Sequence, residues 1–263
     1  MCIMSIYICS DIHGQYTLFM KMLQDIGFSS KDKMFILGDI IDRGPKSIRL
    51  LRYIMSQDNI VCLLGNHEHL MWYNEIEYYS EYSGVWLLDG NGGMKTKKQL
   101  DRLSKKEQEQ IFEYIKNMYL QVEIEVNKQK YLLSHSCFLF RSDTLKWHDL
   151  NRRDVSKVVW NSPWRFWEYT PFEYYEGDGR THIIGHVPVQ KIFVDEYEHE
   201  IRDEDALIKK ANKIEPVIEH SIINIDGGCA YRSKNIFSKA GLICMNLTKY
   251  ANGEENAFTY YNK

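Results

Sequence analysis

The chain has 263 residues, of which 44% are hydrophobic and 26% charged, and its net charge is −3. This composition can bury a substantial core and excludes a largely disordered chain. The slightly negative charge provides no global basic field, so a nucleic-acid polymer is not implied as a partner and any phosphate recognition must be local. The length is compatible with one α/β domain over residues 1–263, because such domains reach about 250 residues.

Six cysteines are spread through the chain without a C-x-x-C pair. An even number is weak support for disulfides in a chain of this length, so we expect buried, reduced thiols. The sequence contains no secretory leader pattern, and no apolar run approaches about 18 residues. We therefore expect a cytoplasmic protein with no membrane partner. The sequence does not indicate an oligomeric state.

The first third of the chain alternates apolar runs of strand length with stretches whose apolar residues recur at helical spacing. Gly27 closes the first helical stretch as a C-cap. In chain order we predict a strand, a helix, a strand, a helix and a strand, over residues 4–9, 16–26, 34–37, 46–56 and 60–64. This order favours βαβ units and an α/β fold.

The rest of the chain is less regular. Residues 97–118 predict one or two charged amphipathic helices with a solvated face. A segment dense in Glu, Asp and Lys, residues 195–220, predicts an exposed insertion. Alternation and apolar runs predict further strands, with a hairpin turn at 127–130, over residues 120–126, 131–133, 181–184, 222–225 and 242–247.

Five short polar signatures each follow a strand-like run. Asp11 and His13 lie two apart on an extended segment, so both can reach one metal ion. Carboxylate, amide and imidazole ligands suit Mn, Fe or Zn better than a thiolate-seeking metal. The signatures predict a two-metal phosphoester hydrolase. They read Ser-Asp-Ile-His-Gly at 10–14, Gly-Asp-Ile-Ile-Asp-Arg-Gly at 38–44, Gly-Asn-His-Glu at 65–68, Ser-His at 134–135 and Gly-His at 185–186.

In this order the signatures resemble those of the calcineurin-like metallophosphoesterase superfamily. The family's leading glycine is replaced by Ser10, and Arg43 favours the serine/threonine phosphoprotein phosphatase branch. The segments 86–93, with its Asn-Gly-Gly, and 223–229 look like the bacterial and phage members of that branch. The resemblance covers nearly the whole chain. It implies a four-layer α/β/β/α sandwich with two central mixed β-sheets.

The resemblance also implies a dinuclear centre, with Mn as the expected metal. A hydroxide that bridges the two ions would attack phosphorus in line. One ion would be held by Asp11, His13 and Asp39, and the second by Asp39, Asn66, His135 and His186.

The remaining roles follow from the same resemblance. His67 is expected to protonate the departing oxygen, and Asp42 to orient its imidazole. Arg43 and Asn66 are expected to bind the substrate phosphate, for which the planar guanidinium group is well suited.

A second phosphate-binding arginine is expected between the fourth and fifth signatures. We assign it to Arg165, and Arg152 and Arg153 are the competing candidates. Two features depart from the family pattern. Ser136 and Cys137 follow the fourth signature where bacterial relatives read Ala-Gly, and the insertion at 195–220 has no counterpart.

Other chemically capable residues receive a structural interpretation. The aromatic stretch 160–175 is expected to pack a loop onto the core, and Tyr231 to pack as an aromatic rather than to enter the site. Cys137 and Cys229 are also expected to be packing residues. The other histidines, of which His69 is the nearest candidate for the site, are His69, His148, His182, His199 and His220.

The leading functional hypothesis is a metal-dependent phosphomonoesterase, a serine/threonine protein phosphatase acting on phosphorylated proteins or peptides. The alternative is a symmetrical dinucleoside tetraphosphate hydrolase, or a phosphodiesterase, acting on a nucleotide phosphoester at the same dimetal site. A phosphate-binding pseudoenzyme is a further alternative. The complete ligand set argues against it.

Overall fold

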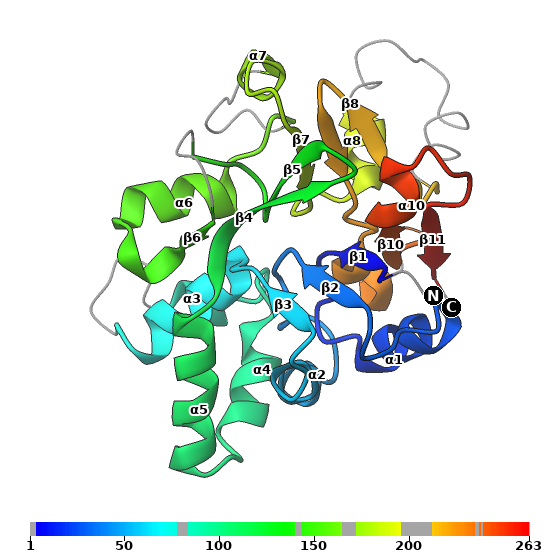
Figure 1. The fold of residues 1–263 in the computed structure, drawn as a ribbon. Coiled ribbons are helices and arrows are strands. Elements are labelled where there is room, and N and C mark those ends of the chain that lie inside the picture. The colour runs from blue at the N-terminus through cyan, green and yellow to red at the C-terminus, as the bar shows by residue number, and fades with distance from the viewer. Residues whose placement is uncertain are drawn as a thin grey trace.

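Two mixed β-sheets form the centre of the molecule (Figure 1). The computed structural model describes residues 4–77, 84–139, 144–164, 172–195, 212–234, 237 and 239–262. Sheet A has the order β11-β10-β1-β2-β3, with β1 (Ile6–Cys9), β2 (Lys33–Ile36), β3 (Ile60–Cys62), β10 (Leu242–Asn246) and β11 (Phe258–Tyr261). Strands β1, β2 and β3 are parallel, whereas β10 pairs with β1 and β11 in the antiparallel sense.

Sheet B combines an antiparallel and a parallel part. Strand β5 pairs with β4 in the antiparallel sense, and β5, β7 and β9 are parallel. Its order is β6-β4-β5-β7-β9-β8, with β4 (Tyr119–Val126), β5 (Gln129–Ser134), β6 (Leu145–Lys146), β7 (Thr181–Ile184), β8 (Val217–Glu219) and β9 (Ile222–Asn224).

Helices cover the outer faces of the sheets. Figure 1 shows α2, α4 and α5 grouped below sheet A. Among the described residues no helix is both long and apolar enough to cross a membrane. The helices are α1 (Tyr16–Asp25), α2 (Ser47–Met55), α3 (Asn66–Glu75), α4 (Gly93–Leu100), α5 (Lys105–Lys116), α6 (Arg152–Trp160), α7 (Phe172–Glu176), α8 (Val189–Asp195) and α10 (Leu247–Ala251).

Three apolar clusters separate the layers. Alternation along each strand sends neighbouring side chains to opposite faces of its sheet. Ile8 and Phe35 of sheet A therefore meet Leu133 and Ile183 of sheet B in a core between the sheets. The other face of sheet A packs against α1, α2 and α5, and the outer face of sheet B packs against Tyr175 of α7. The expected four-layer sandwich is confirmed.

Most predicted elements are confirmed to within one or two residues. The first helix ends in the expected way, because Gly27 adopts φ +64° and the Phe28 amide donates to the Leu23 carbonyl at 2.9 Å. The hairpin turn is also confirmed, with Asn127 and Lys128 both at positive φ. The stretch 97–118 contains the end of α4 and all of α5.

The prediction of an exposed insertion at 195–220 is wrong for its C-terminal part. Residues Val217–Glu219 form β8, which pairs with β9, and Ile214 and Val217 are buried in the core between the sheets. The dense charge of the segment concealed these short apolar contacts. Residues 196–211 lie outside the described part of the chain.

Helix α3 was not predicted, because the sequence pattern placed Gly-Asn-His-Glu only at the end of a strand. The helix begins inside that signature, at Asn66. Its residues from Asn66 to Asn74 are all buried. A helix buried on every side lacks the apolar stripe that reveals an amphipathic helix in a sequence.

Candidate metal centre

The five signatures meet where parallel strands end. Asp11 and His13 follow β1, and Asp39 follows β2. His135 follows β5, and His186 follows β7. The carboxyl ends of parallel strands lie at one edge of a sheet, which is where α/β proteins gather their ligands. Two such edges, one from each sheet, therefore supply one site.

The backbone at this edge adopts an unusual conformation. Six of its non-glycine residues have left-handed φ values of 47° to 71°, which cost free energy and concentrate at functional sites. The bends turn side chains out of the strand direction and toward the site. These residues are Asp11, His13, Asp39, Asp42, Arg43 and His186.

Glycines in the signatures allow the segments to approach closely. A Cβ on Gly65 would lie 2.2 Å from Asp39 Oδ1, and one on Gly44 would lie 1.9 Å from the His13 carbonyl oxygen. A Cβ on Gly185 would lie 2.2 Å from Asp11 Oδ2. No larger residue fits at these positions, so the glycines are explained by contact with the candidate ligands.

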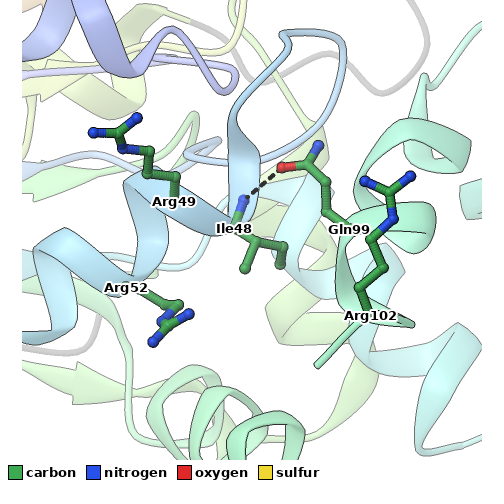
Figure 2. A pocket seen from close by; sticks show the side chains of 5 residues that line it. All are labelled: Ile48, Arg49, Arg52, Gln99 and Arg102. Carbon is green, nitrogen blue, oxygen red and sulfur yellow. Dashed lines mark hydrogen bonds between the residues drawn. The ribbon is translucent and has the colours of Figure 1, made fainter. Parts of the chain in front are cut away.

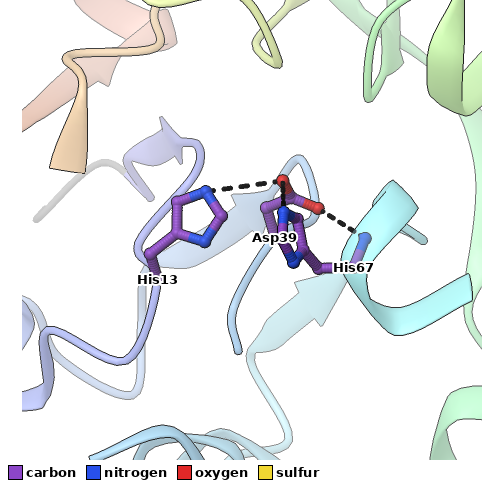
Figure 3. A group of neighbouring side chains, drawn as sticks. All are labelled: His13, Asp39 and His67. Carbon is purple, nitrogen blue, oxygen red and sulfur yellow. Dashed lines mark hydrogen bonds and ion pairs between the residues drawn. The ribbon is translucent and has the colours of Figure 1, made fainter. Parts of the chain in front are cut away.

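The first group of candidate ligands consists of His13, Asp39 and His67. Figure 3 shows these three side chains facing one another from the loop after β1, the loop after β2 and the start of α3. Asp39 Oδ2 lies 3.5 Å from His13 Nε2 and 3.8 Å from His67 Nε2. His13 Nδ1 lies 3.0 Å from the Ile41 carbonyl, which orients its Nε2 toward Asp39.

The second group consists of Asp39, His135 and His186. Asp39 is common to both groups, and its Oδ1 lies 3.6 Å from His135 Nε2. Asn66 joins this group, because its Oδ1 lies 3.0 Å from both His135 Nε2 and His186 Nδ1. The Leu37 carbonyl lies 2.7 Å from His135 Nδ1 and fixes that ring. The arrangement leaves Asp39 between two donor sets.

Asp11 is buried and belongs to neither of these groups. Its Oδ2 accepts a hydrogen bond from the Ser10 hydroxyl and another from the His186 amide, the latter at 3.0 Å. Ser10, the one departure from the family's first block, therefore orients the carboxylate. Asp11 Oδ1 remains as the oxygen through which this residue could bind an ion.

His67 is paired with Asp42 on the side away from Asp39. His67 Nδ1 lies 2.7 Å from Asp42 Oδ2, and Trp86 Nε1 donates to the same oxygen at 2.7 Å. Burial lowers the pKa of His67, and Arg43 lowers it further. Burial raises the pKa of Asp42 to about 7. The pair therefore fixes the imidazole through Nδ1 and leaves Nε2 facing Asp39.

The Asn-Gly-Gly stretch at the start of α4 supports this pair. Gly92, at φ +75°, packs against Arg43, and a Cβ there would lie 3.0 Å from Arg43 Cγ. A Cβ on Gly93 would lie 2.7 Å from Trp86 Nε1. Among the described residues the buried Nε of Arg43 has no hydrogen-bond partner. An unpaired guanidinium nitrogen at the site is suited to a phosphate oxygen.

Glu68 is an important residue of this site that the sequence reasoning did not single out. Its buried carboxylate accepts the amides of Asp39 and Gly65 at 2.9 and 3.1 Å through Oε2. Its Oε1 accepts those of Ile40 and Ile41 at 2.8 and 3.2 Å. The available signal was the glutamate three residues after the glycine that precedes α3, which is capping-box spacing. Glu68 thus fastens the Asp39 loop to α3.

Replacing Glu68 with glutamine is expected to lower the free energy of unfolding by about 3 kcal/mol. An amide offers one acceptor oxygen where the carboxylate offers two, so buried backbone amides lose their partners. Urea unfolding measures the change. Glu109→Gln, at an exposed position of α5, is the control and should shift stability by less than about 0.5 kcal/mol. Equal stability of the two variants would contradict the anchoring role.

Asp226 is a second residue missed at the sequence level. It follows β9, is buried, and accepts the Gly228 amide through Oδ1 at 2.8 Å. Burial raises its pKa, and the nearby carboxylate of Asp11 raises it further. The signal was its place after a predicted strand, in the Asp-Gly-Gly of the segment 223–229.

Several predicted residues do not join the centre. Arg152 lies over the Tyr73 ring at 4.7 Å and 3.7 Å from Glu77, which gives it a surface role. Arg153 is exposed on α6. Arg165, the chosen second phosphate-binding arginine, lies outside the described residues.

The remaining histidines have other surroundings where the structure describes them. His69 is buried against the rings of Tyr73 and Trp147, and burial lowers its pKa to about 3. His182 lies 3.0 Å from Asp178. His148 and His220 are exposed, and His199 lies outside the described residues. The interpretation of the four described histidines as structural or surface residues therefore agrees with the structure.

The departure after the fourth signature has a local explanation. The amides of Ser136 and Cys137 donate to the Val158 carbonyl at 3.2 and 2.9 Å, and the Ser136 hydroxyl donates to the Asn161 carbonyl. These bonds tie the loop to the end of α6. Cys137 and Cys229 are buried and form no disulfide in the described part of the chain, as expected of packing residues.

The donor set fits a pair of cations. Burial raises the pKa of Asp39, and the carboxylates of Asp11 and Glu68 raise it further. Burial lowers the pKa values of His13 and His135, so their imidazoles are neutral and able to bind metal. Buried carboxylates this close together repel one another. A bound cation attracts both and so stabilises their charged forms.

Comparisons with known proteins identify the family of the chain. Residues 4–218 match the family described as Calcineurin-like phosphoesterase. A protein of Wigglesworthia glossinidia brevipalpis named "Bis(5'-nucleosyl)-tetraphosphatase, symmetrical" is 49% identical over 67 residues, which are 25% of this chain and 25% of the relative. A protein of the same name from Erwinia tasmaniensis is 33% identical over 133 residues, which are 49% of this chain and 43% of the relative. The matches thus span between a quarter and a half of these relatives.

Solved structures show the same fold at low sequence identity. A cold-active protein-tyrosine phosphatase of a Shewanella species has a TM-score of 0.52 and 16% identity, with 94% of this chain and 76% of that chain covered. A protein serine/threonine phosphatase from Saccharomyces cerevisiae has a TM-score of 0.51 and 14% identity, with 99% and 80% covered. Because the family match spans most of the chain and the fold agrees with it, the chain belongs to the calcineurin-like phosphoesterase family.

Proposed function

We propose that this metallophosphoesterase is a symmetrical dinucleoside tetraphosphate hydrolase, which cleaves diadenosine tetraphosphate with water into two molecules of ADP. The observation that carries the proposal is the name shared by its curated relatives, symmetrical bis(5'-nucleosyl)-tetraphosphatase. Those matches favour the nucleotide substrate, which was the alternative at the sequence level, over the phosphoprotein substrate of the leading hypothesis.

In this proposal Asp11, His13 and Asp39 hold one ion, and Asp39, Asn66, His135 and His186 hold the other. When bound, a pair of divalent ions supplies a nucleophile at neutral pH and neutralises charge on the phosphoryl group. Mn suits the mixed oxygen and imidazole donors, as do Fe and Zn. The two donor groups around Asp39 support the places of His13, Asp39, His135 and His186 in this assignment.

The protein's own groups handle the leaving oxygen and the phosphate. His67 delivers a proton from Nε2 to the departing oxygen, while Asp42 and Trp86 hold the ring through the 2.7 Å contacts at Asp42 Oδ2. Arg43 binds the phosphoryl oxygens. Its buried Nε has no hydrogen-bond partner among the described residues and so remains available to the phosphate. Asn66, whose Oδ1 lies 3.0 Å from both His135 Nε2 and His186 Nδ1, also contributes to binding the phosphate.

Tyr231 offers a surface for the nucleoside. Its ring lies 5.9 Å from Arg43 Cζ and 4.9 Å from Lys191 Nζ, so two cations flank it at the edge of the site. A half-buried aromatic ring between cations can stack on a base while the cations bind the phosphates that follow. This placement favours a substrate with both an aromatic base and several phosphates.

A turnover comparison tests the proposal. Metal-stripped protein is resupplied with Mn and offered diadenosine tetraphosphate, a phosphothreonine peptide and a phosphodiester. We expect the highest kcat/KM for diadenosine tetraphosphate, with ADP as the sole nucleotide product. Preference for the peptide would overturn the proposal in favour of a protein phosphatase with the same metal centre.

Replacing Tyr231 with leucine is expected to raise the KM for diadenosine tetraphosphate roughly tenfold, because one base–aromatic stacking contact is lost. Hydrolysis of 4-nitrophenyl phosphate, which has no base, should change less than about twofold. Tyr260→Leu, at an exposed position of β11, is the matched control. An equal loss on both substrates would show that Tyr231 is only a packing residue.

A further inference from the structure

A surface pocket of about 300 Å³ lies beside α2 and the C-terminal end of α4, and none of the candidate metal ligands lines it. In Figure 2, Arg49 and Arg52 lie on one side, Gln99 and Arg102 on the other, and Ile48 lies between them. Three of the five lining side chains therefore carry a positive charge.

These charges are only partly neutralised. Arg52 lies 3.4 Å from Glu107 Oε1, and the Arg49 guanidinium lies 4.4 Å from the Tyr16 ring centroid. Over the described ranges, Arg102 makes no hydrogen bond or ion pair. Among the described residues, one carboxylate thus pairs with one of the three guanidinium groups, and the pocket has an excess of about two positive charges.

A purely structural role leaves this arrangement unexplained. Arg49 and Arg52 are three residues apart on α2, so their like charges destabilise the helix by a few tenths of a kcal/mol. The Gln99 side chain already accepts the Ile48 amide at 3.3 Å and donates to the Lys95 carbonyl at 3.0 Å. The helices are therefore joined without the arginines. Among the described residues only Arg52 has a carboxylate partner, which leaves the Arg49 and Arg102 guanidinium groups without a counter-charge.

We propose that this pocket binds a small phosphate-bearing anion. Guanidinium groups donate paired hydrogen bonds to phosphate oxygens, and groups on both sides of the pocket match a tetrahedral dianion. The volume is at the lower limit for ligand pockets, which suits a phosphate or pyrophosphate group rather than a whole dinucleotide.

The pocket shares its two helices with the catalytic loop. The Asp42 amide donates to Ser47 Oγ of α2 at 3.0 Å and to Thr96 Oγ1 of α4 at 3.1 Å. Both hydroxyls lie within a turn of pocket residues Ile48 and Gln99. A bound anion would bridge the helices that hold this loop and is expected to raise the melting temperature of the metal-free protein.

Calorimetric titration with inorganic pyrophosphate tests the proposal. The full chain carrying Arg43→Gln and stripped of metal is the background, so that binding at the metal centre is removed. We expect one bound pyrophosphate. Arg49→Gln and Arg102→Gln should each weaken its binding roughly tenfold. Lys31→Gln, which removes an exposed charge elsewhere, is the control and should leave the affinity unchanged.

Three results would overturn the proposal. The first is the absence of pyrophosphate binding in this background. The second is an equal loss of pyrophosphate affinity in Lys31→Gln and Arg102→Gln. The third is that citrate binds as tightly as pyrophosphate. An arm with ADP distinguishes the source of the phosphate groups. Equal affinities for ADP and pyrophosphate would show that the pocket recognises the phosphates alone. Tighter binding of ADP would show that the nucleoside also contacts the protein. Because no turnover is measured, this outcome is independent of the proposed function.

Discussion

Asp39→Asn is expected to remove bound metal and to reduce phosphoester hydrolysis roughly a thousandfold or more. Asp39 is the carboxylate common to both donor groups, with Oδ2 facing His13 and Oδ1 facing His135. An amide has one neutral oxygen and cannot join two cations. The loss of two ions removes several kcal/mol of transition-state stabilisation, which corresponds to about three orders of magnitude in rate.

Metal content per chain and kcat/KM, measured on the same preparation resupplied with Mn, check this result. Asp25→Asn is the matched control, since Asp25 is exposed on α1 and pairs with Lys21 at 2.9 Å. We expect the control to keep both ions and full activity. Retention of two ions and activity by the Asp39 variant would refute the bridging assignment.

His67→Asn is expected to keep the metal and to lose roughly 10²- to 10⁴-fold in rate on substrates with poor leaving groups. The reason is the placement of His67, whose Nδ1 is held by Asp42 at 2.7 Å while Nε2 faces the centre. A substrate with a good leaving group, such as 4-nitrophenyl phosphate, needs little proton donation. Its rate should fall much less than that of an alkyl phosphate.

The same variant distinguishes two roles, because His67 also lies within one of the donor groups. If His67 were a ligand, the variant would lose metal, and its rates on both substrates would fall alike. Thermal melting shows whether the buried substitution leaves the fold intact. His148→Asn, at an exposed position, is the control and should match the unchanged protein in both assays.

The sequence predicted the strand-ending positions of the candidate ligands because local chemistry marks them. A carboxylate or imidazole directly after an apolar run, next to a glycine, is visible in the chain itself. His135 and His186 follow strands of sheet B and Asp39 follows a strand of sheet A, and it was the resemblance of the ordered signatures to a known family that grouped them. Their long-range meeting follows from the parallel strands that precede them.

Other parts of the site depend on contacts that leave no local pattern. Trp86 reaches Asp42 across 44 residues of sequence, and Glu68 binds the amides of a loop that precedes it by 27 to 29 residues. Such partners are chosen by tertiary packing. Strand β8 escaped prediction for a similar reason, since its buried Val217, like the nearby Ile214, lies within a charged segment.

The left-handed backbone at six residues of the centre affects how its chemistry can be dissected. Alanine in that conformation costs roughly 1–2 kcal/mol, whereas asparagine adopts it readily. An alanine scan of Asp11, Asp39 or Asp42 would therefore report loop distortion together with the missing functional group. Asparagine removes the negative charge and keeps the left-handed backbone conformation. A mutational survey built on asparagine would separate what each side chain does from the shape that its backbone gives the site.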